Sequence, residues 1–119
     1  MKIAVTAQGT NLDAFVDPRF GRCQFFLFID TDSSSVEAVA NESRSAAGGA
    51  GIQAAQFVAG KGAKALITGA VGPNAEAVLK KAAIPAYRGA GTVRAVVEKF
   101  QAGKLPAMEA GGPPGGGAE

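Results

Sequence analysis

One succession of segments recurs along the chain: a short apolar run, a glycine-rich loop and a stretch with helical spacing. Residues 64–68 are followed by the loop 69–74 and then by apolar side chains at positions 75, 78, 79 and 82. Residues 84–87 are followed by the loop 88–92 and then by a stripe of Val93, Val96, Val97 and Phe100. Short apolar runs are typical of buried strands, and apolar residues three and four apart indicate one helix face. This alternation predicts an α/β fold in which the strands on either side of each helix are parallel.

The first half of the chain predicts three further strands and one more helix. Residues 2–7 form a short apolar run, and residues 24–30 and 36–40 flank a polar turn at 31–34, which predicts a hairpin. A loop that ends in glycines, residues 41–51, then precedes a helical run at 52–59. We therefore expect a mixed five-stranded sheet in which only the second strand is antiparallel. Four loops would then meet at one edge of that sheet: 8–23, 41–51, 69–74 and 88–92.

Length and composition predict one domain. A chain of 119 residues with 47% hydrophobic residues can bury a sizeable core. We expect that domain to cover residues 1–102 and a disordered Gly- and Pro-rich tail to follow at 103–119. We find no apolar run of about 18 residues, which a spanning helix needs, and no signal-peptide pattern at the amino terminus. These patterns predict a cytoplasmic protein that does not bind membranes, and a net charge of +2 gives little reason to expect nucleic acid as a partner.

Two scarce residue types limit the chemistry. The chain has no histidine, which excludes imidazole acid–base catalysis and histidine metal ligands. It has one cysteine, whereas an iron–sulfur cluster within one chain normally takes four thiolates. Any metal held here must bring most of its own ligands or lie between subunits.

The segment 17–23 has the composition of a binding site. Arg19 and Arg22 supply planar donors suited to polyatomic anions, and Gly21 permits close approach of the backbone. Cys23 is a soft ligand or nucleophile if the arginines favour its thiolate. The alternative interpretation is a solvated loop with a buried, inert cysteine.

The other glycine loops allow the same two interpretations. A glycine-rich loop that opens a helix leaves backbone donors free at the positive end of the helix dipole, which favours anions. Arg44 and Arg88 lie in or beside these loops, so an anion-binding crevice is one hypothesis and a solvated basic rim is the other. The loops lack the lysine and hydroxyl residue of a nucleotide-hydrolase phosphate loop.

Five motifs in a fixed order resemble the dinitrogenase iron-molybdenum cofactor biosynthesis domain family. The motifs are MKIAV at 1–5, DPRFGRC at 17–23, GGAGIQAA at 48–55, ITGAVGPNA at 67–75 and GAGTV at 89–93. The resemblance implies a ribonuclease-H-like, three-layer α/β fold with strand order 3-2-1-4-5 and helices on both faces of the sheet. It also implies binding or carriage of iron–sulfur or molybdenum-containing clusters, without nuclease activity. Small stand-alone members from anaerobic bacteria include a carrier of a molybdenum–copper sulfide cluster.

From this resemblance we expect a non-enzymatic carrier of an anionic metal-sulfide cluster. Arginines would offset its charge, glycine loops would donate hydrogen bonds, and Phe20 and Val71 would shield it from water. Cys23 would either touch the cluster as a metal ligand or only line the pocket. The expected site comprises Arg19, Phe20, Gly21, Arg22, Cys23, Gly48, Gly49, Gly51, Gly69, Val71, Gly72, Asn74 and Arg88.

Arg19 departs from a histidine found in some relatives, which favours charge pairing over a metal bond at this position. Two alternative functions stay open. One is a phosphate- or nucleotide-binding enzyme, which the missing histidine and the lack of an evident catalytic carboxylate pair disfavour. The other is a regulatory module that docks protein partners, including partners in cluster delivery, through its basic rim.

Overall fold

A computed structural model describes residues 1–108 of the chain. Its sheet contains five strands: β1 (Lys2–Ala7), β2 (Phe25–Asp30), β3 (Val36–Ala40), β4 (Ala65–Thr68) and β5 (Ala86–Arg88). Its helices are α1 (Ala50–Gly60), α2 (Pro73–Lys81) and α3 (Val93–Gln101). The elements follow the predicted order, and most of their bounds lie within two residues of the prediction.

The sheet has the predicted topology. Its strand order is β3-β2-β1-β4-β5, and β2 is antiparallel to both β1 and β3. β4 is parallel to β1 and to β5. Both the strand order and the single antiparallel strand are therefore confirmed.

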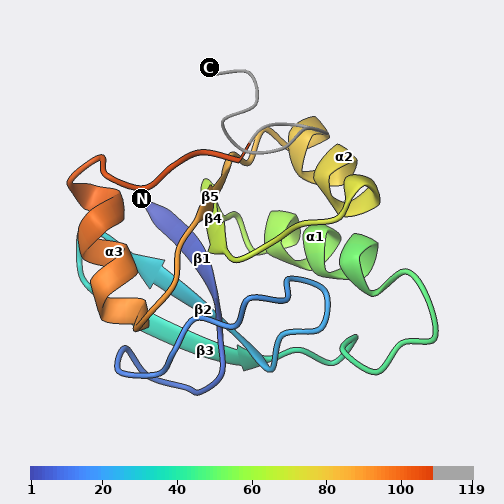
Figure 1. Cartoon of the computed structure of the whole chain (residues 1–119), viewed down its shortest axis with the longest axis horizontal. Helices are drawn as coiled ribbons and strands as arrows, with labels where there is room; N and C mark the ends of the chain where they lie inside the picture. Colours follow the sequence, from blue (N-terminus) through green and yellow to red (C-terminus); the bar gives the residue numbers. More distant parts are fainter. Residues whose placement is uncertain (109–119) are drawn as a thin grey trace.

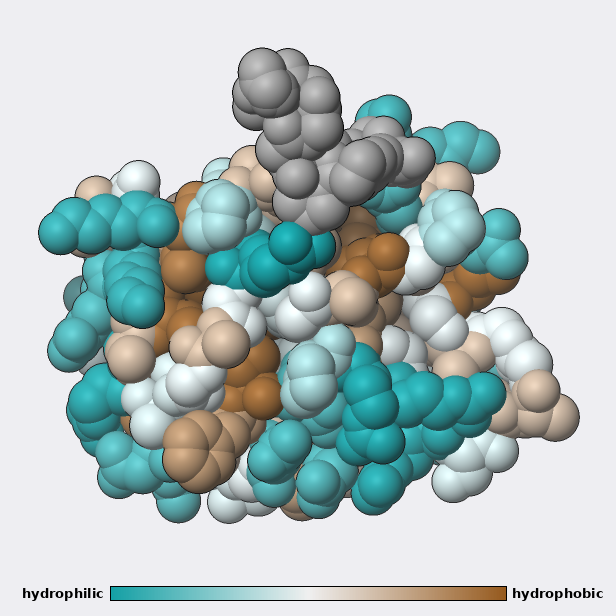
Figure 2. Space-filling model, viewed as in Figure 1, coloured by the Kyte–Doolittle hydropathy of each residue, from teal (hydrophilic) through white to brown (hydrophobic). Residues whose placement is uncertain are grey.

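Helices cover both faces of this sheet, which gives three layers (Figure 1). α1 and α2 pack on one face over a core that includes Phe26, Val58 and Leu66, all of them buried. α3 packs on the other face over a second core, which includes Val5, Ile67 and Val96. β1 and β4 are buried almost throughout because helices cover both of their sides. On the face shown in Figure 2 most residues are hydrophilic or neutral, and hydrophobic residues are seen mainly between them.

The two edges of the sheet differ. The segment that follows α3 runs beside β5. The amide of Arg88 donates to the carbonyl of Pro106 (2.9 Å), and the amide of Met108 donates to the carbonyl of Ala86 (2.8 Å). This segment belongs to the tail for which we expected disorder from residue 103, so residues 103–108 correct that expectation. The rest of the predicted tail, 109–119, lies outside the described residues. The opposite edge is β3, and four of its five residues are exposed.

The strand directions bring the loops to one edge of the sheet. The carboxyl ends of β1, β3, β4 and β5 and the start of β2 lie on the same side, because only β2 runs in the opposite direction. Among residues 1–108 no helix is long and apolar enough to cross a membrane.

Candidate functional site

A cavity of about 300 Å³ lies where three of these loops meet. The loop after β1 contributes Phe20 and Gly21, and the start of α1 contributes Gly49, Gly51 and Ile52. The turn from β4 into α2 completes the lining with Ala70, Gly72, Pro73, Asn74 and Ala75. Segments more than fifty positions apart in the sequence thus form one pocket.

The walls of the cavity approach so closely that glycine is required at the contact. A Cβ on Gly21 would lie 2.7 Å from the amide nitrogen of Gly51, and a Cβ on Gly51 would lie 3.3 Å from the Cβ of Ala75. Contacts below 3 Å with backbone atoms are not tolerated. Gly21 therefore allows the loop after β1 to reach the first turn of α1, and Gly51 allows α1 to approach α2.

Both α1 and α2 begin at this cavity, on the right in Figure 1. Their N-cap residues are Gly49 and Gly72, and neither helix start has a side-chain cap. Gly49 has a φ of 74°, a left-handed conformation that glycine adopts without strain. The first amides of a helix have no partner within the helix. Two sets of such donors, each at the positive end of a helix dipole, therefore adjoin one pocket.

Buried Asp17 fixes the loop that carries Phe20 and Gly21. Its carboxylate accepts hydrogen bonds from the amides of Arg19 and Gln24 (both 3.1 Å) and from the guanidinium of Arg19 (3.1 and 3.2 Å). Its backbone carbonyl accepts a hydrogen bond of 2.7 Å from the hydroxyl of Thr6, which lies 2.7 Å from that of Thr68. The loop is thereby tied to β1 and β4 in the middle of the sheet.

A family model, described as dinitrogenase iron-molybdenum cofactor, matches residues 1–103. The chain belongs to this family. An uncharacterized protein of Methanocaldococcus jannaschii is 30% identical over 113 residues, which cover 92% of each chain.

Two solved structures are similar to this family member over nearly their whole length. The apo form of the orange protein from Desulfovibrio gigas superimposes with a TM-score of 0.88 at 42% identity, over 92% of this chain and 93% of that one. A Thermotoga structure, described as a putative NifB protein of the DUF35 family, gives a TM-score of 0.79 at 35% identity, over 90% and 92% of the two chains. These comparisons confirm the suspected family and the fold, and they support a binding role related to metal cofactors.

The cavity of this family member contains six of the thirteen residues that the sequence predicted for the site. They are Phe20, Gly21, Gly49, Gly51, Gly72 and Asn74. Phe20 is almost fully buried and packs edge-on against Phe26, so its ring belongs to the core as well as to the pocket wall.

The three predicted arginines are not among the residues that line the cavity. Arg19 pairs with Asp17, which raises the pKa of the guanidinium by a hydrogen bond and by charge. Arg22 donates to the carbonyls of Arg44 (2.7 Å) and Ala46 (2.8 Å), and so holds the loop between β3 and α1. Arg88 donates to the carbonyl of Gly69 (3.3 Å). Each arginine thus fixes a loop of the site rather than forming the lining of the pocket.

Cys23 is buried in the core beneath the loop. Burial and the nearby charge of Asp17 raise the pKa of its thiol to about 12. The amide group of Asn41 donates to the carbonyls of Gly21 and Cys23 (both 3.0 Å) and lies 3.6 Å from the Cys23 sulfur. At neutral pH Cys23 is a protonated thiol, which is a poor metal ligand.

The last three predicted residues also lie outside the cavity lining. Gly69 packs against Pro18, where a Cβ would lie 2.6 Å from a backbone atom, and Val71 is half-buried against the core. Gly48 has open space around it.

The sequence-based prediction did not include four lining residues: Ile52, Ala70, Pro73 and Ala75. Ile52, Pro73 and Ala75 belong to the first turns of the two helices, and Ala70 lies between the glycines of one loop. Their place directly after the glycine loops was the available signal. Among residues 1–108 no group of three or more His, Cys, Asp or Glu side chains could hold a metal ion.

Proposed function

We propose that the cavity between α1 and α2 binds an anionic metal-sulfide cluster, of the molybdenum–copper or the iron–molybdenum and iron–sulfur type, and that the chain carries this cargo without catalysing a reaction. The observation that carries the proposal is the convergence of two uncapped helix starts on one cavity of about 300 Å³. Membership in the cofactor family supports a metal-containing cargo. The likeness to the orange protein supports a small chain that binds by itself.

The lining suits a cluster that arrives with its own sulfide ligands. Backbone amides of a helix start donate hydrogen bonds to anions without forming metal bonds. The ring of Phe20 and the side chain of Ile52 add apolar surface, which suits soft, weakly hydrated sulfides. The charge of Arg22 lies in a supporting loop, where it adds a positive field at longer range, whereas that of Arg19 is offset by Asp17.

Substitution of Asn74 by Asp tests the charge of the cargo. Asn74 is an exposed residue in the first turn of α2 and lines the cavity. A carboxylate there stabilises the helix by about 0.3–1 kcal/mol through the dipole, and repels an anion in the pocket. We expect Asn74→Asp to raise the unfolding midpoint slightly and to weaken cluster uptake about fivefold or more.

The measurement is reconstitution of the apoprotein with tetrathiomolybdate and copper, followed by its charge-transfer absorption. The matched control is Asn11→Asp, because Asn11 is an exposed loop residue that does not line the cavity. Unchanged uptake by Asn74→Asp would place the cluster elsewhere. Anaerobic reconstitution with iron and sulfide distinguishes the cargo types, and magnesium-dependent binding of nucleotides in place of clusters would favour the phosphate-binding alternative.

A further inference from the structure

The edge strand β3 has three residues whose backbone groups point away from the sheet. The amide of Asn41 donates to the carbonyl of Gln24 and that of Asp30 to the carbonyl of Ser35 (both 3.0 Å), so these two residue pairs are hydrogen-bonded pairs of the β2–β3 ladder. Hydrogen-bonded pairs alternate with non-bonded pairs in an antiparallel ladder. Given the register of the two strands, Glu37 and Val39 bond to β2, while Val36, Ala38 and Ala40 direct their amide and carbonyl groups outward. No described segment covers this edge, whereas residues 106–108 cover β5.

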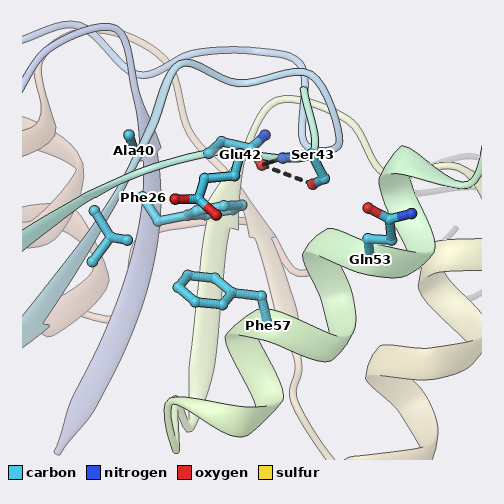
Figure 3. A pocket seen from close by; sticks show the side chains of 8 residues that line it. Phe26, Ala40, Glu42, Ser43, Gln53 and Phe57 are labelled. Atoms are coloured by element: carbon cyan, nitrogen blue, oxygen red, sulfur yellow. Dashed lines mark hydrogen bonds between the residues drawn. The ribbon is translucent and has the colours of Figure 1, made fainter. Parts of the chain in front are cut away.

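A second cavity of about 300 Å³ adjoins the end of β3. Phe26 from β2 and Phe57 from α1 pack against each other in its wall, with ring centroids 5.5 Å apart (Figure 3). Phe57 keeps 38% of its surface exposed, so its ring offers apolar surface at this groove. The two rings form the apolar part of this groove, and Ala40 lies beside them.

The rim of the groove is acidic. Glu42 extends over the two rings from the loop after β3 (Figure 3). Glu37 on the strand is held by Lys61 at 2.9 Å, but no ion pair joins Glu42 to a cation of residues 1–108. A cationic side chain from a partner would therefore find the Glu42 carboxylate without a competing ion pair.

We propose that the open edge of β3 and the Phe26–Phe57 groove form a docking site for an extended segment of a partner protein, which carries a bulky apolar side chain flanked by Lys or Arg. The segment pairs with the outward groups of Val36, Ala38 and Ala40 and adds a sixth strand to the sheet. Its apolar side chain enters the groove beside Phe57, and its cation pairs with Glu42. The site is separate from the cavity between α1 and α2, so this inference is independent of the cargo.

A second copy of the chain fits the groove less well. Two β3 strands that pair all three outward residues in antiparallel fashion must match Ala38 with Ala38 and Val36 with Ala40. In that register Glu37 of one copy lies opposite Val39 of the other, on the face of the groove. A carboxylate would then meet the aromatic rings and the acidic rim, which is unfavourable for both reasons.

Short peptides provide the probe. We choose acetylated Thr-Lys-Val-Phe-Val-Lys-Thr with a fluorescent label, because side chains two apart on a strand share one face, and three variants: Phe replaced by Ala, both Lys replaced by Glu, and both Val replaced by Pro. Fluorescence anisotropy with the apoprotein should show binding of the first peptide. We expect each variant to bind about tenfold or more weakly, because it lacks the aromatic anchor, the cation or the strand donors.

Amide hydrogen exchange locates the bound strand. In the free protein the amides of Val36, Ala38 and Ala40 should exchange faster than those of Glu37 and Val39, which bond to β2. Addition of the first peptide should slow exchange at the three outward amides and leave the inward ones unchanged. Binding that leaves the outward amides unprotected would overturn the proposal.

Two protein variants test the groove, each with a matched control. Phe57→Ala should weaken the first peptide about tenfold, whereas Phe15→Ala, at a phenylalanine that is 60% exposed on another loop, should have no effect. Glu42→Lys should reverse the preference between the Lys- and Glu-flanked peptides, whereas Glu98→Lys on α3 should not. Equal binding of both peptides to wild type and to Glu42→Lys, or self-association of the chain through the outward amides, would also refute the proposed occupant.

Discussion

The N-cap residues of α2 and α3 have almost the same backbone dihedral angles, but only that of α3 has a side chain that caps the helix. The N-cap of α2 is Gly72, with φ −74° and ψ 165°, and that of α3 is Thr92, with φ −76° and ψ 153°. The Thr92 hydroxyl accepts a hydrogen bond of 3.2 Å from the amide of Ala95. The corresponding amide of α2 belongs to Ala75, and Gly72 has no side chain to offer it.

The loop after β1 adds to this difference, because its carbonyls accept hydrogen bonds from the start of α3. The amide of Val93 donates to the carbonyl of Ala14 (2.9 Å), and that of Arg94 to the carbonyl of Leu12 (2.8 Å), so three first-turn amides of α3 are bonded within the protein. The same loop approaches α1 with Gly21. Both helix starts lie at one edge of the sheet, but the start of α3 is bonded within the protein, whereas the start of α2 lies at the cavity for which we propose a ligand.

Gly21→Ala should have the largest effect on stability and on cluster uptake, because its new side chain forces the loop after β1 away from α1. The new Cβ would lie 2.7 Å from the amide nitrogen of Gly51, and overpacking of this kind costs about 1–3 kcal/mol. We expect a lower free energy of unfolding in urea and loss of cluster uptake. Gly48→Ala is the control, because a Cβ there meets nothing within 4 Å. Similar losses of stability and uptake in both variants would show that the close contact between Gly21 and Gly51 is not their cause.

Thr92→Ala should remove the cap of α3 and leave the cavity as it is. Loss of an N-cap hydroxyl costs about 1 kcal/mol. We therefore predict a less stable protein in thermal or urea unfolding that takes up the cluster as wild type does. Reduced uptake by the folded variant would mean that the start of α3 also takes part in binding.

The smallest effect on stability is expected for Gly72→Thr, which gives α2 the cap of α3. The backbone of Gly72 already has the extended geometry of a cap, and a Cβ there meets nothing within 4 Å. Stability should rise by a few tenths of a kcal/mol. Cluster uptake should fall about threefold to tenfold, because the hydroxyl takes one amide from the ligand. A variant that is stabilised but binds as before would show that the α2 amides do not contact the cargo.

The alternation of apolar runs and glycine loops was sufficient to predict the sheet, because strand directions follow from chain order and right-handed crossovers. The same topology brought Phe20, Gly49 and Gly72 to one edge, as expected. It could not tell which acceptor each guanidinium would meet. Arg22 is held by carbonyls of the loop after β3, and such contacts depend on loop conformations that a sequence pattern does not specify.

Cys23 and the segment after α3 show the same limit. Cys23 directly follows the predicted site residues 19–22, but the turn at Gly21 directs it into the core, where Asn41 covers it. Residues 103–108 have a composition typical of a tail, yet backbone bonds to β5 and the packing of Leu105 on the second core hold them in place.

The contact between Gly21 and Gly51 also limits how this cavity can be redesigned. Neither position accepts a side chain freely, Phe20 and Ala75 are buried, and Pro73 starts a helix. Gly49 has a positive φ, so four lining positions remain open to ordinary substitution: Ile52, Ala70, Gly72 and Asn74. A library restricted to these four residues would sample most of the selectivity that the scaffold can acquire.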